Sequence, residues 1–487
     1  MKKIIFLLLL LHKFTFASFD MNENMQSTYS YIIELDFISA KNNIAMEQIN
    51  NPDNGLIQLY QNYIDFLTVM IGEDLLFFEN IENKKSERLS KLRDNDKKSP
   101  YYLYSQAELH LQWAFARLKF EDYIPAAYEF IKAYYLLEKN KELFPNFILN
   151  NKCLGVLHSL LSAVPSQYHW ILNVAGLEGN VDLGFSELKM ILDDPGCKMY
   201  KNEVLFLVSL LQINLKNNNS MCQQYLDRIG DGYKTNYLLN FAAARLSHNI
   251  GNNDYCLKVL DNRPSSAGKH PFYFLDYLQG MSYLYKLDYE KSKQYFLKYI
   301  KCFRGLNYIK SSYHKLAWIA ELQNEPEQKT KYFDKTILEG NEYIDSDKVA
   351  LKDAKKNYIS HPTLLRSRLL YDGGYYLEAL TELKQDIFDN NAEYFYRIAR
   401  IKYKLGFENA DVISAYKRSV ELSEGSTNYF GPMSILQIGL IYEQANDLKN
   451  AKESFYECLS ISNFDYERGI HQKAKAGINR IELVPKP

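Results

Sequence analysis

Residues 432–461, PMSILQIGLIYEQANDLKNAKESFYECLSI, constrain the fold more than any other stretch of this sequence. On both sides of Asn446-Asp447, residues of one helical face recur at the spacing of an α-helix: Ile435, Ile438, Gly439 and Tyr442 before it, and Ala451, Phe455, Cys458 and Leu459 after it. Small Gly439 and Ala451 would let two helices approach closely, and Asp447 would cap the second helix. The stretch therefore predicts a helical hairpin. Because one hairpin cannot bury its own apolar face, we expect further copies.

The same residues resemble the tetratricopeptide repeat (TPR) family, whose L-G-x2-Y and A-x3-F pattern marks the two helices of each repeat. Looser copies of this pattern occur at 100–137, 203–229, 237–260, 276–302, 313–338, 363–386 and 394–422. The predicted fold class is all-α: a TPR-like helical-hairpin solenoid wound as a right-handed superhelix.

The distribution of these copies predicts the domain organisation. We expect a signal peptide at 1–17, an N-terminal helical region at 18–99, a modified TPR-like array at 100–338, a charged helical linker at 339–362, and a C-terminal TPR array with a capping helix at 363–481. Within the N-terminal region, 55–79 carries an apolar helical stripe, and 80–98 is strongly charged. We interpret the charged stretch as a solvated helix or a linker.

The first 17 residues have the features of a secretory leader. A basic start is followed by an apolar run from Ile4 to Leu11 and by small Thr15 and Ala17, which are spaced like a signal-peptidase site. An uncleaved anchor is the alternative, but the run has about half the length that a membrane span needs. We expect an exported protein, in the periplasm or associated with the cell envelope, without a transmembrane segment in the mature chain.

A second resemblance concerns residues 153–192. Gly155-Val156-Leu157-His158 and the run 176–180, GLEGN, are similar to the stretch that precedes the repeats in the TPR family of mitochondrial inclusion-body clearance proteins. Residues 429–481 resemble exported bacterial TPR proteins. The resemblance to the inclusion-body clearance proteins implies an interaction protein without a catalytic site, although this chain departs from that family in its secretory leader.

Charge and cysteine content exclude some functions. The formal net charge is −1, so the basic excess that phosphate binding needs is absent and a nucleic-acid partner is not expected. The six cysteines show no C-x2-C spacing. Cys222 and Cys256 lie one TPR period apart, on helices that would pack ~8–10 Å apart, which is beyond easy disulfide reach. We expect both to be small core residues, as we do for Cys458.

Candidate catalytic and metal-ligating residues have simpler structural explanations. His158 and His169 lie on either side of Pro165, so only a fold-back could join them in a metal site. Asp193-Asp194 and Asp182 are placed like turn and capping residues. Because no nucleophile or phosphate-binding motif occurs, we predict no enzyme, no cofactor and no metal site.

The predicted function is a non-catalytic protein–protein interaction scaffold of the cell envelope, which binds a peptide or protein partner on the concave TPR surface. A small-molecule ligand is not expected. Helix phase alone selects four partner-binding residues: Arg397, Lys402, Gln437 and Tyr442. A glycan-binding envelope module is the alternative, because tyrosine-rich runs such as 101–104 could line a sugar groove. A hydrolase on a helical scaffold is a third possibility, since sequence cannot measure the separation of two carboxylates.

Overall fold

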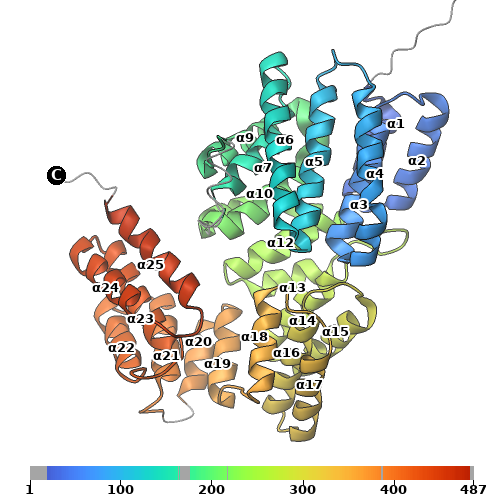
Figure 1. Ribbon diagram of the computed structural model, residues 1–487. Helices are drawn as coiled ribbons and strands as arrows, with labels where there is room; N and C mark the ends of the chain where they lie inside the picture. Colours follow the sequence, from blue (N-terminus) through green and yellow to red (C-terminus); the bar gives the residue numbers. More distant parts are fainter. Residues whose placement is uncertain (1–18, 163, 165–175, 217, 385–387, 483–487) are drawn as a thin grey trace, which may run out of the picture. The chain divides into compact units, whose positions relative to one another are not determined.

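The computed structural model describes residues 19–162, 164, 176–216, 218–384 and 388–482 of the 487-residue chain. These residues form helices joined by short connections, and no β-strand occurs among them (Figure 1). Consecutive helices pack in pairs, which confirms the predicted all-α fold class of TPR-like helical hairpins. The predicted signal peptide, 1–17, lies outside the described residues.

The chain divides into two compact units. The first unit takes the chain up to Met281 together with Lys291–Ala317 and Thr330–Lys355. The second unit takes Ser282–Glu290, Trp318–Lys329 and the chain from Lys356 onward. The last change between the units falls within the predicted linker 339–362, whereas the other predicted domain borders stay predictions.

The first unit begins with helices that pack in hairpins, within the predicted N-terminal helical region 18–99. Its first helices are α1 (Glu23–Ile33), α2 (Phe37–Asn50), α3 (Leu56–Gly72), α4 (Leu75–Arg93), α5 (Tyr101–Lys119) and α6 (Tyr123–Leu143). The stretch 55–79 is divided because Glu73 takes a left-handed φ of 53° and Asp74 caps α4, accepting from Phe77 N at 3.0 Å.

The stretch 80–98, interpreted as a solvated helix or a linker, is helical over most of its length and most of its residues are exposed, but one face of the helix is buried. Most of this stretch belongs to α4, which packs against α3 and α5. Leu89 and Leu92 are buried, and so is Arg88, whose guanidinium donates to Asp65 Oδ2 at 2.6 Å. The buried face was not predicted, because a partner such as Asp65, which pairs with Arg88, lies on another helix.

The middle of the first unit follows the predicted helix boundaries. It contains α7 (Asn150–Leu161), α9 (Val181–Asp193), α10 (Lys201–Leu211), α11 (Asn219–Ile229), α12 (Tyr237–Asn249) and α13 (Asn253–Asp261), with short helical turns at Pro195–Tyr200, Gln212–Lys216 and Gly230–Lys234. A helix ends before Pro165 and another begins beside Asp182, as expected. A Cβ added at Gly155 would lie 2.7 Å from Leu188 Cγ, so glycine permits α7 and α9 to pack closely.

The first unit closes on itself. Asn236 Nδ2 donates to Ile33 O at 3.0 Å, and His270 N donates to Leu35 O at 2.7 Å. These bonds join the α1–α2 turn to segments more than two hundred residues later in the chain. The hairpins of this unit therefore surround an interior instead of forming an open row.

The remaining helices follow the predicted hairpins. They are α14 (Phe274–Tyr285), α15 (Tyr289–Cys302), α16 (Ile309–Leu322), α17 (Pro326–Leu338), α18 (Asp345–Lys355), α19 (Pro362–Asp372), α20 (Tyr376–Leu383), α21 (Ala392–Lys404), α22 (Asn409–Glu421), α23 (Phe430–Gln444), α24 (Leu448–Ser460) and α25 (Glu467–Glu482). Helix α25 packs against α23 and α24, where the sequence places a capping helix.

The hairpin of α23 and α24 has the predicted chemistry. Asp447 caps α24, accepting from Asn450 N at 3.2 Å. A Cβ added at Gly439 would lie 2.7 Å from Phe455 Cε1, so glycine makes room for this fully buried ring. Cys222, Cys256 and Cys458 are fully buried, which confirms their role as small core residues.

Candidate functional site

The interior of the first unit holds a pocket of about 410 Å³. Its wall is formed largely by the inward faces of α3, α5, α7, α10 and α12. The lining residues recur at helical spacing: Tyr63, Phe66, Leu67 and Met70 on α3, Glu108, Leu111 and Phe115 on α5, Glu203, Phe206, Leu207 and Leu210 on α10, and Leu238, Phe241 and Arg245 on α12. The pocket is thus made by one face of each of several helices.

Charged side chains meet at one end of this pocket. Lys152 of α7 is 2% exposed, and its ammonium contacts the carboxylates of Glu108 and Glu203. The distance from Lys152 Nζ to Glu203 Oε2 is 2.9 Å, and Lys152 Nζ donates to the Tyr63 hydroxyl at 2.7 Å. Tyr29 of α1 donates to Glu203. We call Lys152, Glu108, Glu203, Tyr63 and Tyr29 the lysine cluster.

The groups of the lysine cluster shift one another's pKa values. Burial by itself would lower the pKa of Lys152, but Glu108 and Glu203 raise it above its usual value. Burial raises the pKa of Tyr29 and Tyr63, so both phenols stay protonated. A hydrolase needs one carboxyl group free to give a proton and another free to attack. Because one ammonium and two hydroxyl groups engage both carboxylates, the cluster does not favour the hydrolase alternative.

A second ion pair, between Glu73 and Lys119, also lines the pocket and does not belong to the lysine cluster. Glu73 Oε1 lies 2.6 Å from Lys119 Nζ, and Glu73 Oε2 accepts from Asn307 N at 3.0 Å. Next to Asn307, Tyr308 N donates to Asp347 Oδ2 at 2.7 Å. Burial raises the pKa of Asp347 to about 6. These contacts fix the segment before α16 against the helices that line the pocket.

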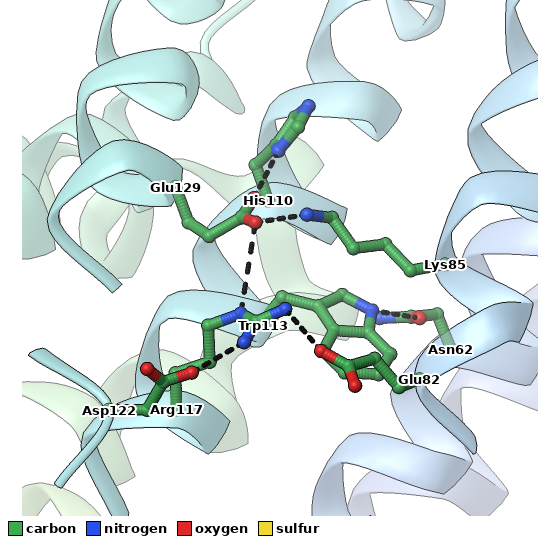
Figure 2. A network of polar contacts seen from close by, with 8 residues as sticks. All are labelled: Asn62, Glu82, Lys85, His110, Trp113, Arg117, Asp122 and Glu129. Carbon is green, nitrogen blue, oxygen red and sulfur yellow. Dashed lines mark hydrogen bonds and ion pairs between the residues drawn. The ribbon is translucent and has the colours of Figure 1, made fainter. Parts of the chain in front are cut away.

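Figure 2 shows a polar network between α4, α5 and α6. The carboxylate of Glu129 contacts Lys85, His110 Nδ1 at 2.5 Å and Arg117 Nε at 3.9 Å. Burial would raise the pKa of Glu129, but His110 and Lys85 lower it below its usual value, so this group stays ionised. His110 and Glu129 do not line the pocket, and we interpret the network as a tie between three helices.

Hydrogen bonds beside this network set the orientation of the Gln112 amide, which lines the pocket. Asn62 Oδ1 accepts from Trp113 Nε1 at 3.0 Å and from Arg88 at 3.1 Å. Asn62 Nδ2 therefore points the other way and donates to Gln112 Oε1 at 2.7 Å. Gln112 is 4% exposed, and its Nε2 has no hydrogen-bond partner among the described residues. A buried donor is thus left unsatisfied at the pocket.

Other polar pairs have structural roles. His158 Nδ1 lies 2.6 Å from Glu187 Oε2, whereas His169 falls outside the described residues. Asp194 accepts from Gly196 N at 2.6 Å, which confirms its predicted turn role, and Asn180 caps α9. Over the described part of the chain, no group of three or more His, Cys, Asp or Glu residues could hold a metal ion.

The four predicted partner-binding residues lie in different surroundings. Arg397 is 3% exposed, and its Nε donates to Glu393 Oε1 at 2.8 Å. Lys402 lies 5.8 Å from the centroid of the Phe407 ring. Gln437 and Tyr442 are half-buried on α23. The role of these residues stays a prediction, but the side chain of Arg397 is already engaged inside the protein.

Two arginines that the sequence analysis did not select have more open side chains. Arg368 of α19 and Arg400 of α21 are 38% and 27% exposed. The Arg400 guanidinium lies 4.1 Å from the Tyr371 ring centroid, and that of Arg368 lies 5.1 Å from the Trp318 ring centroid. Both face Asp372, at 3.7 Å and 3.9 Å.

The sequence does contain a signal for these two arginines, because each directly follows a small residue that packs inside its hairpin. Ser367 Oγ donates to Ala379 O at 2.9 Å, so Ser367 faces the second helix of its hairpin. Fully buried Ala399 takes the same place on α21. Arg368 and Arg400 each follow such a small residue, so they share one register on successive first helices. Counting from the small residue would have selected Arg400 instead of Arg397.

Comparisons with known proteins add little to this description. No family model matches the chain, and neither does any curated protein. The APC/C hetero-tetramer Cut9–Hcn1 is similar at a TM-score of 0.27 and 11% identity, over 91% of this chain and 88% of that chain. Yeast Tom70 is similar at a TM-score of 0.33 and 12% identity, over 88% of each chain. At these scores the likeness carries no functional argument. Within the described residues, no helix is long and apolar enough to cross a membrane.

Proposed function

We propose that this chain is a non-catalytic protein-interaction scaffold that holds an acidic peptide segment of a protein partner against α19 and α21. The observation that carries the proposal is the pair of partly open arginines, Arg368 and Arg400, which share the carboxylate of Asp372. One positive charge is therefore in excess at this place. An acidic partner would supply the missing carboxylate.

The physical chemistry of the arginines supports a carboxylate ligand. A guanidinium that stacks on an aromatic face keeps a defined orientation and can donate two parallel hydrogen bonds to a carboxylate. Arg400 stacks on Tyr371, and Arg368 stacks on Trp318. The same stacking weakens the glycan alternative, because a sugar needs an aromatic face that is still uncovered. The carboxylates of the lysine cluster are engaged by Lys152, Tyr63 and Tyr29, which supports the proposal of a non-catalytic protein.

The test is peptide binding to the full chain, measured by fluorescence polarisation. A labelled peptide pool rich in Asp and Glu should bind, and a pool in which Lys and Arg replace these residues should not. The double variant Arg368→Gln/Arg400→Gln should weaken binding at least tenfold, which corresponds to about 1.4 kcal/mol.

The matched control is Lys417→Gln/Arg418→Gln, which removes the same charge from α22, the second helix of its hairpin. This control should bind the acidic pool like the unchanged protein. Equal binding of the basic pool, or equal weakening by both double variants, would show that net charge and not the arginine pair attracts the peptides.

We also propose that the protein acts in the cell envelope after export, because of the leader-like residues 1–17. The N-terminal sequence of the protein purified from its native cells tests this proposal directly. A mature chain that begins near residue 18 supports export, whereas one that still begins at Met1 contradicts it.

A further inference from the structure

The pocket of the first unit has an apolar wall that could surround a small molecule. Aromatic rings form one side: the Phe241 centroid lies 6.1 Å from that of Phe206, 5.3 Å from that of Phe272 and 5.8 Å from that of Phe274. The volume of about 410 Å³ falls in the range of ligand-binding cavities, roughly 300–1,000 Å³. Such a wall favours an occupant with an apolar body.

The positively charged side chains at the pocket differ in whether a carboxylate of the protein pairs with them. Lys152 and Lys119 are each paired with carboxylates. Arg245 lines the same pocket, one helical turn after Phe241, and forms neither a hydrogen bond nor an ion pair with any described residue. The other unsatisfied group is Gln112 Nε2. Both groups are hydrogen-bond donors, so the occupant should supply acceptors.

Arg245 has no direct ion-pair partner among the described residues. Glu73, Glu108 and Glu203, the acidic residues of the described lining, are bonded to lysines. A half-buried guanidinium without a partner loses part of its hydration and gains nothing in return. A carboxylate from outside would compensate it with charge-assisted hydrogen bonds.

We propose that this pocket binds a small amphipathic acid, an apolar chain with one carboxylate, and that Arg245 binds the carboxylate. A neutral lipid would leave Arg245 unpaired, and a highly charged metabolite would place its remaining charges against phenylalanine and leucine. The site lies within the first unit and does not involve Arg368 or Arg400. It is therefore independent of the proposed peptide site.

The experiment is a titration of the full chain with cis-parinaric acid, a fluorescent fatty acid, followed by displacement with dodecanoate or dodecanol. We expect saturable binding of one molecule per chain, and dodecanoate should displace the probe at least tenfold more effectively than dodecanol. The variant Arg245→Gln should remove this preference and leave the affinity for dodecanol unchanged.

Two further variants keep the test decisive. Arg228→Gln removes an arginine of similar exposure on α11, outside the pocket, and should change nothing. Val156→Phe fills part of the pocket and should reduce binding of both ligands. Equal displacement by dodecanol and dodecanoate, or binding that survives both Arg245→Gln and Val156→Phe unchanged, would overturn the proposal. The Arg368→Gln/Arg400→Gln variant should bind the fatty acid normally.

Discussion

In the first unit the helices around the pocket bury the ammonium group of Lys152, whereas in the second unit Arg368 and Arg400 stay partly exposed although Arg397 is buried beside them. Lys152 is 2% exposed in the first unit, but Arg368 is 38% exposed in the second. The helical hairpin is the same in both. The comparison teaches that the hairpin fixes where a residue lies on its helix, and that the packing of neighbouring helices decides whether this place is buried.

The two units also fill their interiors differently. In the second unit Gly439 and Gly477 lie against the Phe455 ring, so α23, α24 and α25 meet without a gap. In the first unit Phe206 of α10 and Phe241 of α12 both line the pocket, and their ring centroids lie 6.1 Å apart.

The largest effect should come from the lysine cluster. Lys152→Met leaves two carboxylates buried without their cation and should destabilise the first unit by about 3–5 kcal/mol. Adding Glu108→Gln and Glu203→Gln should restore much of this loss. Hydrogen exchange measured by mass spectrometry separates the units, and protection should fall in α7 but not in α24.

The control for this prediction is Lys258→Met, which removes an exposed lysine of α13 in the same unit. It should leave protection unchanged. If Lys152→Met costs no more than Lys258→Met, the buried charges do not support the first unit, and the contrast between the units fails.

A smaller effect is expected from overpacking in the second unit. Gly439→Val would press against the Phe455 ring and should cost about 1–3 kcal/mol. The loss of protection should be confined to α23, α24 and α25. Gly469→Ala is the matched change in α25, where an added Cβ meets no atom within 4 Å. It should be neutral or stabilise by at most about 1 kcal/mol, and the same loss from both variants would refute the proposed contact.

Acid should weaken the closure of the first unit. Burial and the charge of Lys41 lower the pKa of His270 to about 4, whereas an unfolded histidine titrates near 6.5. Between these values the unfolded chain binds the proton at this residue, so the contribution of His270 to stability falls as the pH decreases, by at most about 1.4 kcal/mol per pH unit.

His270→Phe keeps the ring that packs 4.9 Å from Phe37, centroid to centroid, but cannot titrate. Urea unfolding at pH values of about 7 and about 5 should show a smaller pH dependence in this variant than in the unchanged protein. An equal pH dependence would mean that other groups cause the acid sensitivity.

The smallest effect should come from the surface of the second unit. Arg480 donates to both oxygens of Glu443, at 2.7 Å and 2.6 Å, but its side chain is half exposed. Glu443→Gln should therefore cost less than about 1 kcal/mol in urea unfolding. A cost as large as that of Lys152→Met would remove the distinction between buried and exposed charges on which the comparison depends.

The sequence predicted those parts of the fold that depend on neighbouring residues. The cap at Asp447, the close packing at Gly439 and the helix that starts near Asp182 are local features, and the structure has all of them. The buried face of the charged stretch 80–98 was not predicted, because the partner of Lys85 is Glu129, on another helix. Helix phase selected Arg397. Its partner Glu393 stands four residues earlier on the same helix, a spacing that the sequence shows, but only the packed structure reveals that Arg397 is buried.

The pocket could not be predicted, because its parts are far apart in the sequence. The Tyr63 hydroxyl lies 2.6 Å from Glu203 Oε1, and these residues are 140 positions apart. No pattern within one hairpin indicates such a contact. The apolar stripe at 55–79 was visible, but it does not say whether its partner is another helix or a ligand.

The closed first unit has a consequence for how this part of the chain unfolds. In an open repeat array each repeat touches only its neighbours, so terminal repeats can detach one at a time. Here the α1–α2 turn is bonded to Asn236 and His270, and Tyr29 is bonded to Glu203. Fraying of the α1–α2 hairpin therefore breaks contacts with segments far along the chain. Such long-range contacts also slow folding. The first unit should therefore form late in folding and unfold cooperatively, as one unit.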